Sequence, residues 1–273
     1  MESVIPTDAY ALIIGAGKCG TSSLYSYLAE HPEICAAVVK EPEFFSRNTR
    51  HGIHVEEYSE LWSFNASIHK YALEASTNYS NYPVQTDVPR RIFEHNIQPK
   101  FIYVVRNPFE RIESQHNFLS QHEWWKTDIV DAQPINMSKY FLQLEQFRKF
   151  FPSKDFLVLD FERLIKDPES VLQMVYSFLG LQSSYFPREY RSINKTYVQS
   201  STEKLIGRNL GALLPYVPVP MKKAGRKLIR KVLPKPKKRL LTDEERDFVF
   251  HELRSDMKKL SEDYGVDVGK WGF

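Results

Sequence analysis

The sequence has little cysteine, little net charge and no long apolar run. Its 273 residues include only two cysteines, which cannot form a disulfide framework, so we expect Cys19 and Cys35 to be reduced thiols in a reducing compartment. The formal net charge of +3 does not favour a nucleic-acid-binding protein or any other general binder of polyanions. No apolar stretch approaches the roughly 20 residues of a membrane-spanning helix, and no leader-like segment precedes the first apolar run. These absences predict a cytoplasmic protein.

Two patterns of site chemistry are absent as well. No carboxylate pair or histidine cluster has convincing metal-ligand spacing, so we expect no metal site. The Walker pattern requires Ser or Thr directly after Gly-Lys, whereas Cys-Gly-Thr follows Lys18. The ordinary Mg-nucleotide loop is therefore disfavoured.

The sequence does contain a regular alternation of apolar runs and amphipathic stretches, with 42% hydrophobic residues to fill a core. Strands are predicted at Tyr10–Ile14, Ile34–Val39, Tyr71–Ala75, Phe101–Val105 and Phe156–Asp160. Asp167 begins a helix that Gly180 ends, and the capping box that starts at Thr242 begins a long amphipathic helix. We predict an α/β fold: a single domain over 1–273 with three layers around a central, mostly parallel sheet.

The first predicted strand runs into a turn of small residues. Glycines allow this turn to curl tightly and a ligand to approach its backbone. The helix that follows directs unsatisfied N–H groups and a positive dipole end into the turn, which suits an anion such as a phosphate. The candidate binding residues are Gly17, Lys18, Cys19, Gly20, Thr21, Ser22 and Ser23. Taken alone, the pattern could also be a glycine-rich turn with a solvated lysine.

A second anion-binding pattern follows the apolar run Phe101–Val105. Arg106 comes directly after it, and Asn107-Pro is typical of the start of a helix. In that helix Arg111 and Ser114 lie on one face. Arginine donates two hydrogen bonds in one plane, which suits a phosphate. A lone Arg-Asn-Pro is more often a helix cap, but two strand ends with complementary chemistry favour a binding site.

The spacing of these motifs resembles the sulfotransferase superfamily that uses 3′-phosphoadenosine 5′-phosphosulfate (PAPS). Lys18-Cys-Gly-Thr-Ser-Ser-Leu is similar to its P-loop-like 5′-phosphosulfate turn, and Arg106 with Ser114 is similar to its 3′-phosphate element. Lys40-Glu-Pro-Glu-Phe-Phe resembles the acidic motif of the carbohydrate-type, heparan-sulfotransferase-like branch and its bacterial relatives. The resemblance covers nearly the whole chain, including the stretch that begins at Gly52 and the closing helix.

The resemblance implies PAPS as sulfuryl donor, adenosine 3′,5′-bisphosphate (PAP) as product, and no metal. It implies transfer to a hydroxyl, less favourably an amine, of a carbohydrate, glycolipid or related small molecule. By analogy with phosphoryl transfer, Lys18 would stabilise the leaving oxygen, while N–H groups from Gly20 to Ser22 hold the 5′-phosphate.

The resemblance also implies that Glu41 is the general base for the acceptor proton. Glu74 is our second choice and Glu43 a distant third, and Glu41 could instead be an ordinary surface glutamate. One position departs from the branch, which often has a lysine after the glutamate of the strand Tyr71–Ala75. Ala75 stands there, which argues against a heparan-like acceptor.

Acceptor-binding residues are less clearly indicated. We name Glu74, Trp124 and Trp125 as candidates. The two tryptophans lie in a polar stretch over 121–136 and could form a lid or stacking platform over a sugar, or could pack beneath the loop. Lys195 or Arg208 could complete the 3′-phosphate site.

A basic, proline-containing segment covers 213–240, ahead of the closing helix and tail at 241–273. Its cations, between 222 and 239, alternate with apolar residues. The segment could make peripheral contact with the anionic inner surface of a membrane, recruit an acidic glycan, or be a solvated linker.

Two other functions remain open at this stage. A nucleotide kinase or NTPase would use the first turn and would bind Mg-ATP. A non-catalytic polyanion- or membrane-binding module would depend on the basic segment, and its binding would survive the loss of Arg106. The second alternative does not explain why Lys18, Glu41, Arg106 and Ser114 all follow predicted strands.

Overall fold

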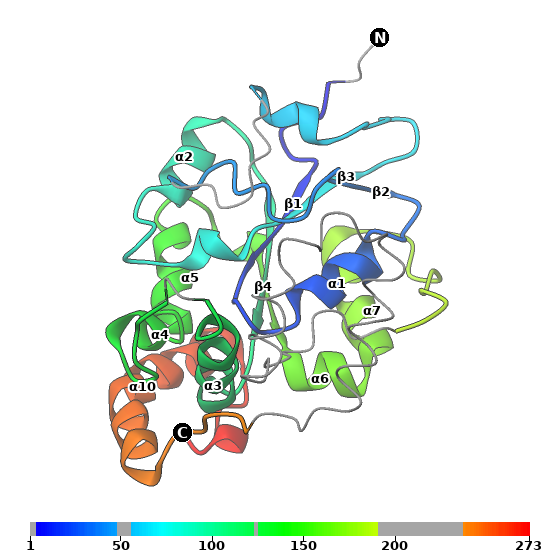
Figure 1. The fold of residues 1–273 in the computed structure, drawn as a ribbon. Coiled ribbons are helices and arrows are strands. Elements are labelled where there is room, and N and C mark those ends of the chain that lie inside the picture. The colour runs from blue at the N-terminus through cyan, green and yellow to red at the C-terminus, as the bar shows by residue number, and fades with distance from the viewer. Residues whose placement is uncertain (1–3, 48–55, 123–124, 191–236) are drawn as a thin grey trace, which may run out of the picture.

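The structure is a computed structural model that describes residues 4–47, 56–122, 125–190 and 237–273 (Figure 1). Five strands form its central sheet: β1 (Tyr10–Gly15), β2 (Ile34–Ala36), β3 (Tyr71–Ala75), β4 (Lys100–Val105) and β5 (Phe156–Asp160). All neighbouring strands pair in parallel, in the order β2-β3-β1-β4-β5. The predicted α/β fold with a parallel sheet is therefore confirmed.

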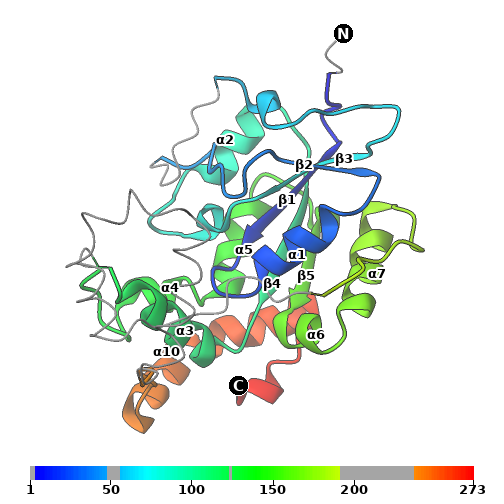
Figure 2. The ribbon, with the colours of Figure 1, turned by 45° about the vertical axis from the view of Figure 1, so that its right-hand side comes forward.

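Helices cover both faces of this sheet. They are α1 (Thr21–Leu28), α2 (Val88–Glu94), α3 (Pro108–Leu119), α4 (Ala132–Asn136), α5 (Tyr140–Arg148), α6 (Phe161–Lys166), α7 (Pro168–Leu179) and α10 (Asp243–Tyr264). Short 3₁₀ turns lie at Tyr58–Leu61, Thr77–Ser80, Ser153–Asp155 and Gly269–Trp271. Figures 1 and 2 show α1, α6 and α7 on one side of the sheet and α2, α5 and α10 on the other, which gives the three expected layers.

Local signals set several helix boundaries as predicted. The side chain of Asn107 caps α3. Thr242 and Glu245 form the capping box at the start of α10, with both reciprocal hydrogen bonds present. Gly180, at φ 62°, ends α7 in the left-handed conformation that favours glycine.

One strand is shorter than the sequence predicts. The run Ile34–Val39 forms a strand only as far as Ala36. The amide of Val38 donates to the carbonyl of Leu61 instead of a β3 carbonyl, and the Val38 side chain is 68% exposed. The prediction is wrong at this end, because an apolar run does not show where the chain changes its hydrogen-bond partner.

The central strand β1 marks a change of direction in the topology. The chain passes from β1 to β2 and β3 on one side, and then crosses to β4 and β5 on the other. Open α/β sheets bind ligands at the carboxyl ends of the strands beside such a point. Leu12, Ile13 and Ile14 of β1 are at most 1% exposed, so this edge of the sheet rests on a closely packed core.

Several sequence-based expectations fall outside the described residues: Trp124, Lys195, Arg208, residues 52–55 of the stretch from Gly52 to Trp62, and the part of the basic segment before residue 237. Within the described ranges, both cysteines are buried free thiols. No helix in those ranges is long and apolar enough to cross a bilayer.

Candidate active site

Backbone hydrogen bonds gather several loops at the carboxyl edge of the sheet. The amide of Ala16, just after β1, donates to the carbonyl of Val104 on β4 at 2.8 Å. The amide of Glu41 donates to the carbonyl of Ala75, the last residue of β3, at 2.9 Å. The turn after β1, the end of β4 and the segment that carries Glu41 therefore lie around one point.

The turn after β1 has the backbone of an anion-binding loop. Gly20 adopts a left-handed φ of 80°, and a Cβ there would lie 2.7 Å from the Phe161 ring, so a side chain does not fit. Lys18 is also left-handed, at φ 71°, which is uncommon for a non-glycine residue. No described side chain forms a cap hydrogen bond at the start of α1, at its N-cap residue Gly20. The positive end of α1 therefore faces the turn.

Other predicted residues of the turn are packed more deeply. Thr21 and Ser23 are buried, whereas Gly17 and Ser22 are half-buried. Cys19 is 0% exposed, and burial raises the pKa of its thiol to about 12. Cys19 is thus a packed thiol rather than a nucleophile, because the reactive form is the thiolate.

The Lys18 ammonium lies in a partly desolvated, electropositive environment. Its Nζ is 4.0 Å from the centre of the Phe118 ring on α3. Burial lowers the pKa of Lys18 to about 8, the Arg106 guanidinium acts in the same direction, and the Glu41 carboxylate acts against both. The three charged groups are therefore close enough to influence one another. Because the Lys18 and Arg106 cations repel each other, an anionic ligand between them is favoured.

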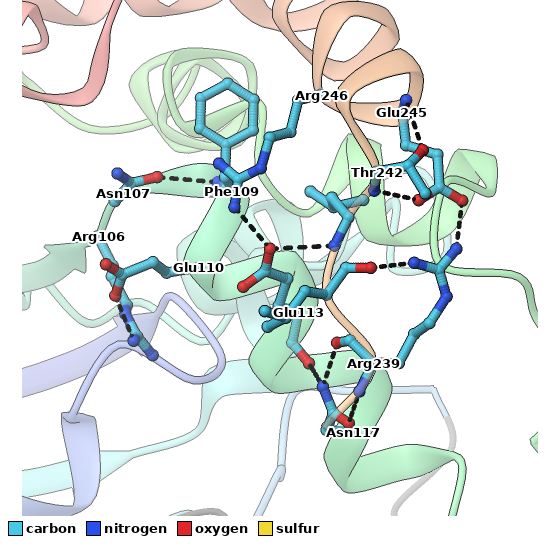
Figure 3. Close-up of polar contacts among 12 residues, drawn as sticks. Arg106, Asn107, Phe109, Glu110, Glu113, Asn117, Arg239, Thr242, Glu245 and Arg246 are labelled. Carbon is cyan, nitrogen blue, oxygen red and sulfur yellow. Dashed lines mark hydrogen bonds and ion pairs between the residues drawn. The ribbon is translucent and has the colours of Figure 1, made fainter. Parts of the chain in front are cut away.

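Arg106 connects this turn to the start of α3. Its guanidinium donates to the Glu110 carboxylate at 2.6 Å (Figure 3). It also donates to the Lys18 carbonyl at 3.3 Å and lies 4.7 Å from the centre of the Phe161 ring. The Nε atom of Arg106 is buried and has no hydrogen-bond partner among the described residues. A buried cationic donor without a protein partner fits a phosphate oxygen.

Ser114 lies half-buried on α3, about two helical turns after Arg106. Phe118, one turn further on the same side of α3, is 43% exposed and contacts the Lys18 ammonium. This face of α3 is therefore directed toward the turn after β1. The structure brings the two predicted phosphate elements together.

The segment after α3 lies next to this face. The His122 ring is 6.0 Å from the Phe118 ring, and the backbone amide of Trp125 donates to the His122 carbonyl at 3.0 Å. Trp125 is half-buried. Its role as an acceptor platform stays a prediction.

The segment ahead of α10 holds α3 in place (Figure 3). Asn117 exchanges two hydrogen bonds with the backbone of Arg239, at 2.7 and 2.8 Å. Glu113 accepts one bond from the Leu241 amide at 3.1 Å and another from the Arg246 guanidinium at 2.8 Å. These contacts fix the helix that follows the predicted phosphate arginine.

Glu41 stands on a left-handed turn with φ 60°. Its carboxylate is paired with the Lys40 ammonium, and its side chain is 26% exposed. The Glu41 carboxylate lies close enough to Lys18 to act on its pKa, and part of its surface stays accessible to a substrate.

The two other candidate glutamates are buried. Glu74, on β3, is 0% exposed, and Glu43 is 2% exposed. The hydroxyls of Tyr58 and Ser76 donate to the two carboxylate oxygens of Glu74, each at 2.5 Å. Burial raises the pKa of Glu74. This position favours a role within the protein over direct contact with a ligand.

The donor set as a whole fits a phosphate-bearing ligand. Lys18, Arg106 and the positive end of α1 converge, and Gly20 keeps the loop backbone close. In the described part of the chain, no group of three or more His, Cys, Asp or Glu side chains is placed to hold a metal ion. The arrangement can bind an anion, stabilise a charged leaving group and offer a carboxylate base beside it.

Comparison with protein families agrees with this geometry. The family model described as the sulfotransferase domain matches residues 8–261. This chain belongs to the sulfotransferase domain family. The resemblance to the PAPS-dependent superfamily is thereby confirmed, and the matched range includes Lys18, Glu41, Arg106 and Ser114.

Relatives of this sulfotransferase include enzymes named for heparan sulfate. It is 29% identical over 188 residues to human "Heparan sulfate glucosamine 3-O-sulfotransferase 5", covering 63% of this chain and 53% of that protein. It is 25% identical over 199 residues to human "Bifunctional heparan sulfate N-deacetylase/N-sulfotransferase 3", covering 64% of this chain and 22% of that protein. The chain spans about half the length of the 3-O-sulfotransferases it matches, and less of the bifunctional protein.

A solved bacterial structure shows the same fold. The sulfotransferase from Alicyclobacillus acidocaldarius aligns over 97% of this chain and 99% of its own, with a TM-score of 0.66 and 19% sequence identity. The three-layer arrangement of this sulfotransferase is thus one already seen in the family.

Three aromatic residues of the site were not predicted from the sequence. Phe161 packs against both Gly20 and the Arg106 guanidinium. Phe118 contacts Lys18, and the Tyr140 hydroxyl donates to the Arg106 carbonyl at 2.8 Å. Only Phe118 could have been found from the sequence, because it lies one helical turn after Ser114 and therefore on the same face of the helix. The other two come from elements that pack beside the site only after folding.

Proposed function

We propose that this sulfotransferase transfers a sulfuryl group from PAPS to a hydroxyl, or less favourably an amine, of a carbohydrate, glycolipid or related small molecule. One arrangement carries the proposal: the loops that bear Lys18, Arg106 and Glu41 meet at the carboxyl edge of the sheet. There Arg106 donates to the Lys18 carbonyl, and the Glu41 amide donates to the end of β3. An anion-binding protein needs only the two cations. The carboxylate beside them adds the base that a transfer reaction requires.

The two phosphate groups of the donor would be held by different elements. The start of α1 and Lys18 would bind the 5′-phosphate, and Arg106 with Ser114 the 3′-phosphate. Bound PAPS supplies the sulfuryl group and a phosphate leaving group. The Lys18 ammonium is placed to neutralise the charge that develops on the leaving oxygen, and Glu41 is placed to accept the acceptor's proton.

The names of the relatives support a carbohydrate acceptor. One is named for O-sulfation of glucosamine and the other for N-sulfation, so both kinds of acceptor atom occur among them. We favour a hydroxyl because general-base removal of its proton gives Glu41 a clear role. Ala75, where the branch often has lysine, favours an acceptor with less anionic charge than heparan sulfate.

A radiolabel experiment tests this function directly. The protein would be incubated with sulfur-labelled PAPS and a panel of neutral glycans, glycolipids and heparosan, with EDTA present throughout. Transfer of label to at least one hydroxyl-bearing acceptor is expected. A panel that stays unlabelled while the protein binds PAP would contradict the proposed acceptor class, and failure to bind PAP would contradict the donor.

Arg106→Ala is expected to weaken PAP binding roughly 30- to 100-fold, because a charge-assisted pair of hydrogen bonds to the phosphate is lost. Isothermal titration calorimetry with PAP measures the change. Arg90→Ala is the matched control, since Arg90 pairs with Glu94 at 2.7 Å as Arg106 pairs with Glu110. Equal affinities for the two variants would place the 3′-phosphate elsewhere.

PAP binding is expected to take up protons above neutral pH. Lys18 has a pKa of about 8 in the free protein, so roughly half of it is uncharged at pH 8. A bound anion favours the ammonium and raises this pKa, so binding takes up about half a proton at pH 8 and more at pH 9. Because only the ammonium binds well, the apparent Kd should rise about tenfold between pH 7 and pH 9.

Calorimetric titrations in buffers of different ionisation enthalpy measure this proton uptake. Phosphate groups are fully ionised in this pH range and do not obscure the result. Lys18→Met should abolish the uptake. Binding whose heat does not depend on the buffer at pH 8 would contradict the assigned contact between Lys18 and the ligand.

A further inference from the structure

Glu74 has an unusual set of partners for a buried carboxylate. It is 0% exposed on β3 and is bonded to hydroxyls rather than to a cation. Tyr58 and Ser76 donate to it at 2.5 Å each, and the Tyr79 hydroxyl lies close enough to act on its pKa. Both carboxyl oxygens of Glu74 act as acceptors, one for Tyr58 and one for Ser76, so these hydroxyls direct their protons toward Glu74.

Two of these three hydroxyls also hold the loop that follows Glu41. A hydroxyl that directs its proton to Glu74 leaves its oxygen lone pairs to accept. Ser76 Oγ accepts the Glu43 amide at 3.0 Å, and the Tyr79 oxygen accepts the Phe45 amide at 3.3 Å. Among the described residues, the Tyr58 hydroxyl receives no amide of this loop, although its ring packs 4.7 Å from that of Phe45.

This loop needs support because its backbone is strained. Glu41 and Glu43 have φ values of 60° and 53°, in the left-handed region that non-glycine residues avoid. Such conformations persist at functional sites only when surrounding contacts determine them. Three backbone amides of the loop are anchored: Glu41 to the Ala75 carbonyl, Glu43 to Ser76, and Phe45 to Tyr79. Asn78 also donates to the Glu43 carboxylate at 3.2 Å, and Arg91 to the Phe45 carbonyl at 3.1 Å.

We propose that Glu74 is a positioning residue for the transfer reaction, acting on Glu41 through the hydroxyls of Ser76 and Tyr79. Its carboxylate fixes the direction of both hydroxyl protons, so both oxygens accept loop amides and hold Glu41 in its left-handed turn beside Lys18. The inference rests on the proposed function, because it takes Glu41 as the base. It assigns Glu74 no contact with either substrate.

Two phenylalanine variants form a matched test. Tyr79→Phe and Tyr58→Phe each remove one buried hydroxyl beside Glu74 and keep the ring, but only Tyr79 accepts a loop amide. We expect kcat to fall about tenfold in Tyr79→Phe and to stay within about twofold of wild type in Tyr58→Phe. The Kd for PAP should be unchanged in both, since the loop does not hold the donor. Equal kcat values for the two variants would overturn the proposal.

A second test separates positioning from general destabilisation. Glu74→Gln replaces an obligate acceptor with a side chain that also donates, so it disturbs the direction of the hydroxyl protons. It should lower kcat at least about tenfold in the wild-type background and less than about twofold when Glu41→Gln is already present. An equal loss in both backgrounds would contradict action through Glu41.

A measurement that needs no turnover distinguishes this inference from the proposed function. Amide hydrogen exchange of Glu43 and Phe45, followed by NMR, should be faster in Tyr79→Phe than in Tyr58→Phe. Suppose that the wild-type protein transfers no label to any acceptor in the radiolabel assay but that amide exchange is faster in Tyr79→Phe. The positioning of the loop would then be upheld and the proposed function rejected. Unchanged exchange, in a protein that does transfer sulfuryl groups, would reject the positioning role alone.

Discussion

Replacing Glu41 with glutamine is expected to lower kcat by about 10²- to 10⁴-fold, the usual contribution of a general base. Glutamine has nearly the same volume and can adopt the same left-handed turn, but it cannot take a proton. Affinity for PAP should change little, because the donor phosphates are assigned to Lys18, α1, Arg106 and Ser114. The effect should therefore appear in kcat rather than in binding.

Single-turnover kinetics with preloaded PAPS measures this change most cleanly, because product release does not limit the rate. Glu33→Gln provides a control: Glu33 also pairs with a lysine, Lys70, at 2.7 Å, and its side chain is 21% exposed. The control should retain wild-type activity. If Glu41→Gln kept activity within about tenfold of wild type, a different group would have to serve as the base.

Replacing Lys18 with methionine is expected to lower kcat by about 10²- to 10³-fold, the typical loss when one preorganised stabiliser of transition-state charge is removed. The ammonium is already partly desolvated over the Phe118 ring, so its charge acts strongly on a leaving oxygen nearby. Methionine keeps the apolar stem and its packing. A moderate loss of PAP affinity should accompany the larger loss of rate.

The comparison between rate and affinity decides how Lys18 acts. In a single-turnover experiment at saturating PAPS, weaker donor binding no longer affects the rate, so the measured rate constant is that of the chemical step. Lys70→Met, a change to a lysine whose side chain is 50% exposed, serves as control and should have no effect on either quantity. A Lys18→Met enzyme that regains full kcat at saturation would show that Lys18 only binds the donor.

Local sequence signals were sufficient for much of the fold. The apolar runs at β1, β3, β4 and β5 were confirmed because strands buried on both faces are continuous in sequence. The helix starts at Asn107 and Thr242 were confirmed because capping chemistry is also local. The end of β2 was missed because Val38 changes to Leu61 as its partner, a contact that no local pattern shows.

The charged residues of the candidate site could be named from the sequence, but the residues that pack against them and hydrogen-bond to them could not. Lys18, Arg106 and Glu41 follow or adjoin strands, so topology alone places them near one another. Glu74 was named as a candidate for contact with the acceptor, but both faces of this parallel sheet are covered, which buries it. Ser76 and Tyr79 follow Glu74 closely in sequence, but Tyr58 and the rings of Phe161 and Tyr140 come from other elements. Their roles depend on tertiary packing.

Titration of the protein with PAP by calorimetry, in EDTA, tests the central claim most directly, with Mg-ATP as the comparison ligand. The two phosphate elements at β1 and β4 predict micromolar binding of PAP that needs no metal and that Arg106→Ala weakens roughly 30- to 100-fold. Mg-ATP should bind far more weakly, because no Ser or Thr directly follows Lys18 to hold the magnesium ion. Binding of Mg-ATP without binding of PAP would contradict the account and favour a nucleotide kinase or NTPase.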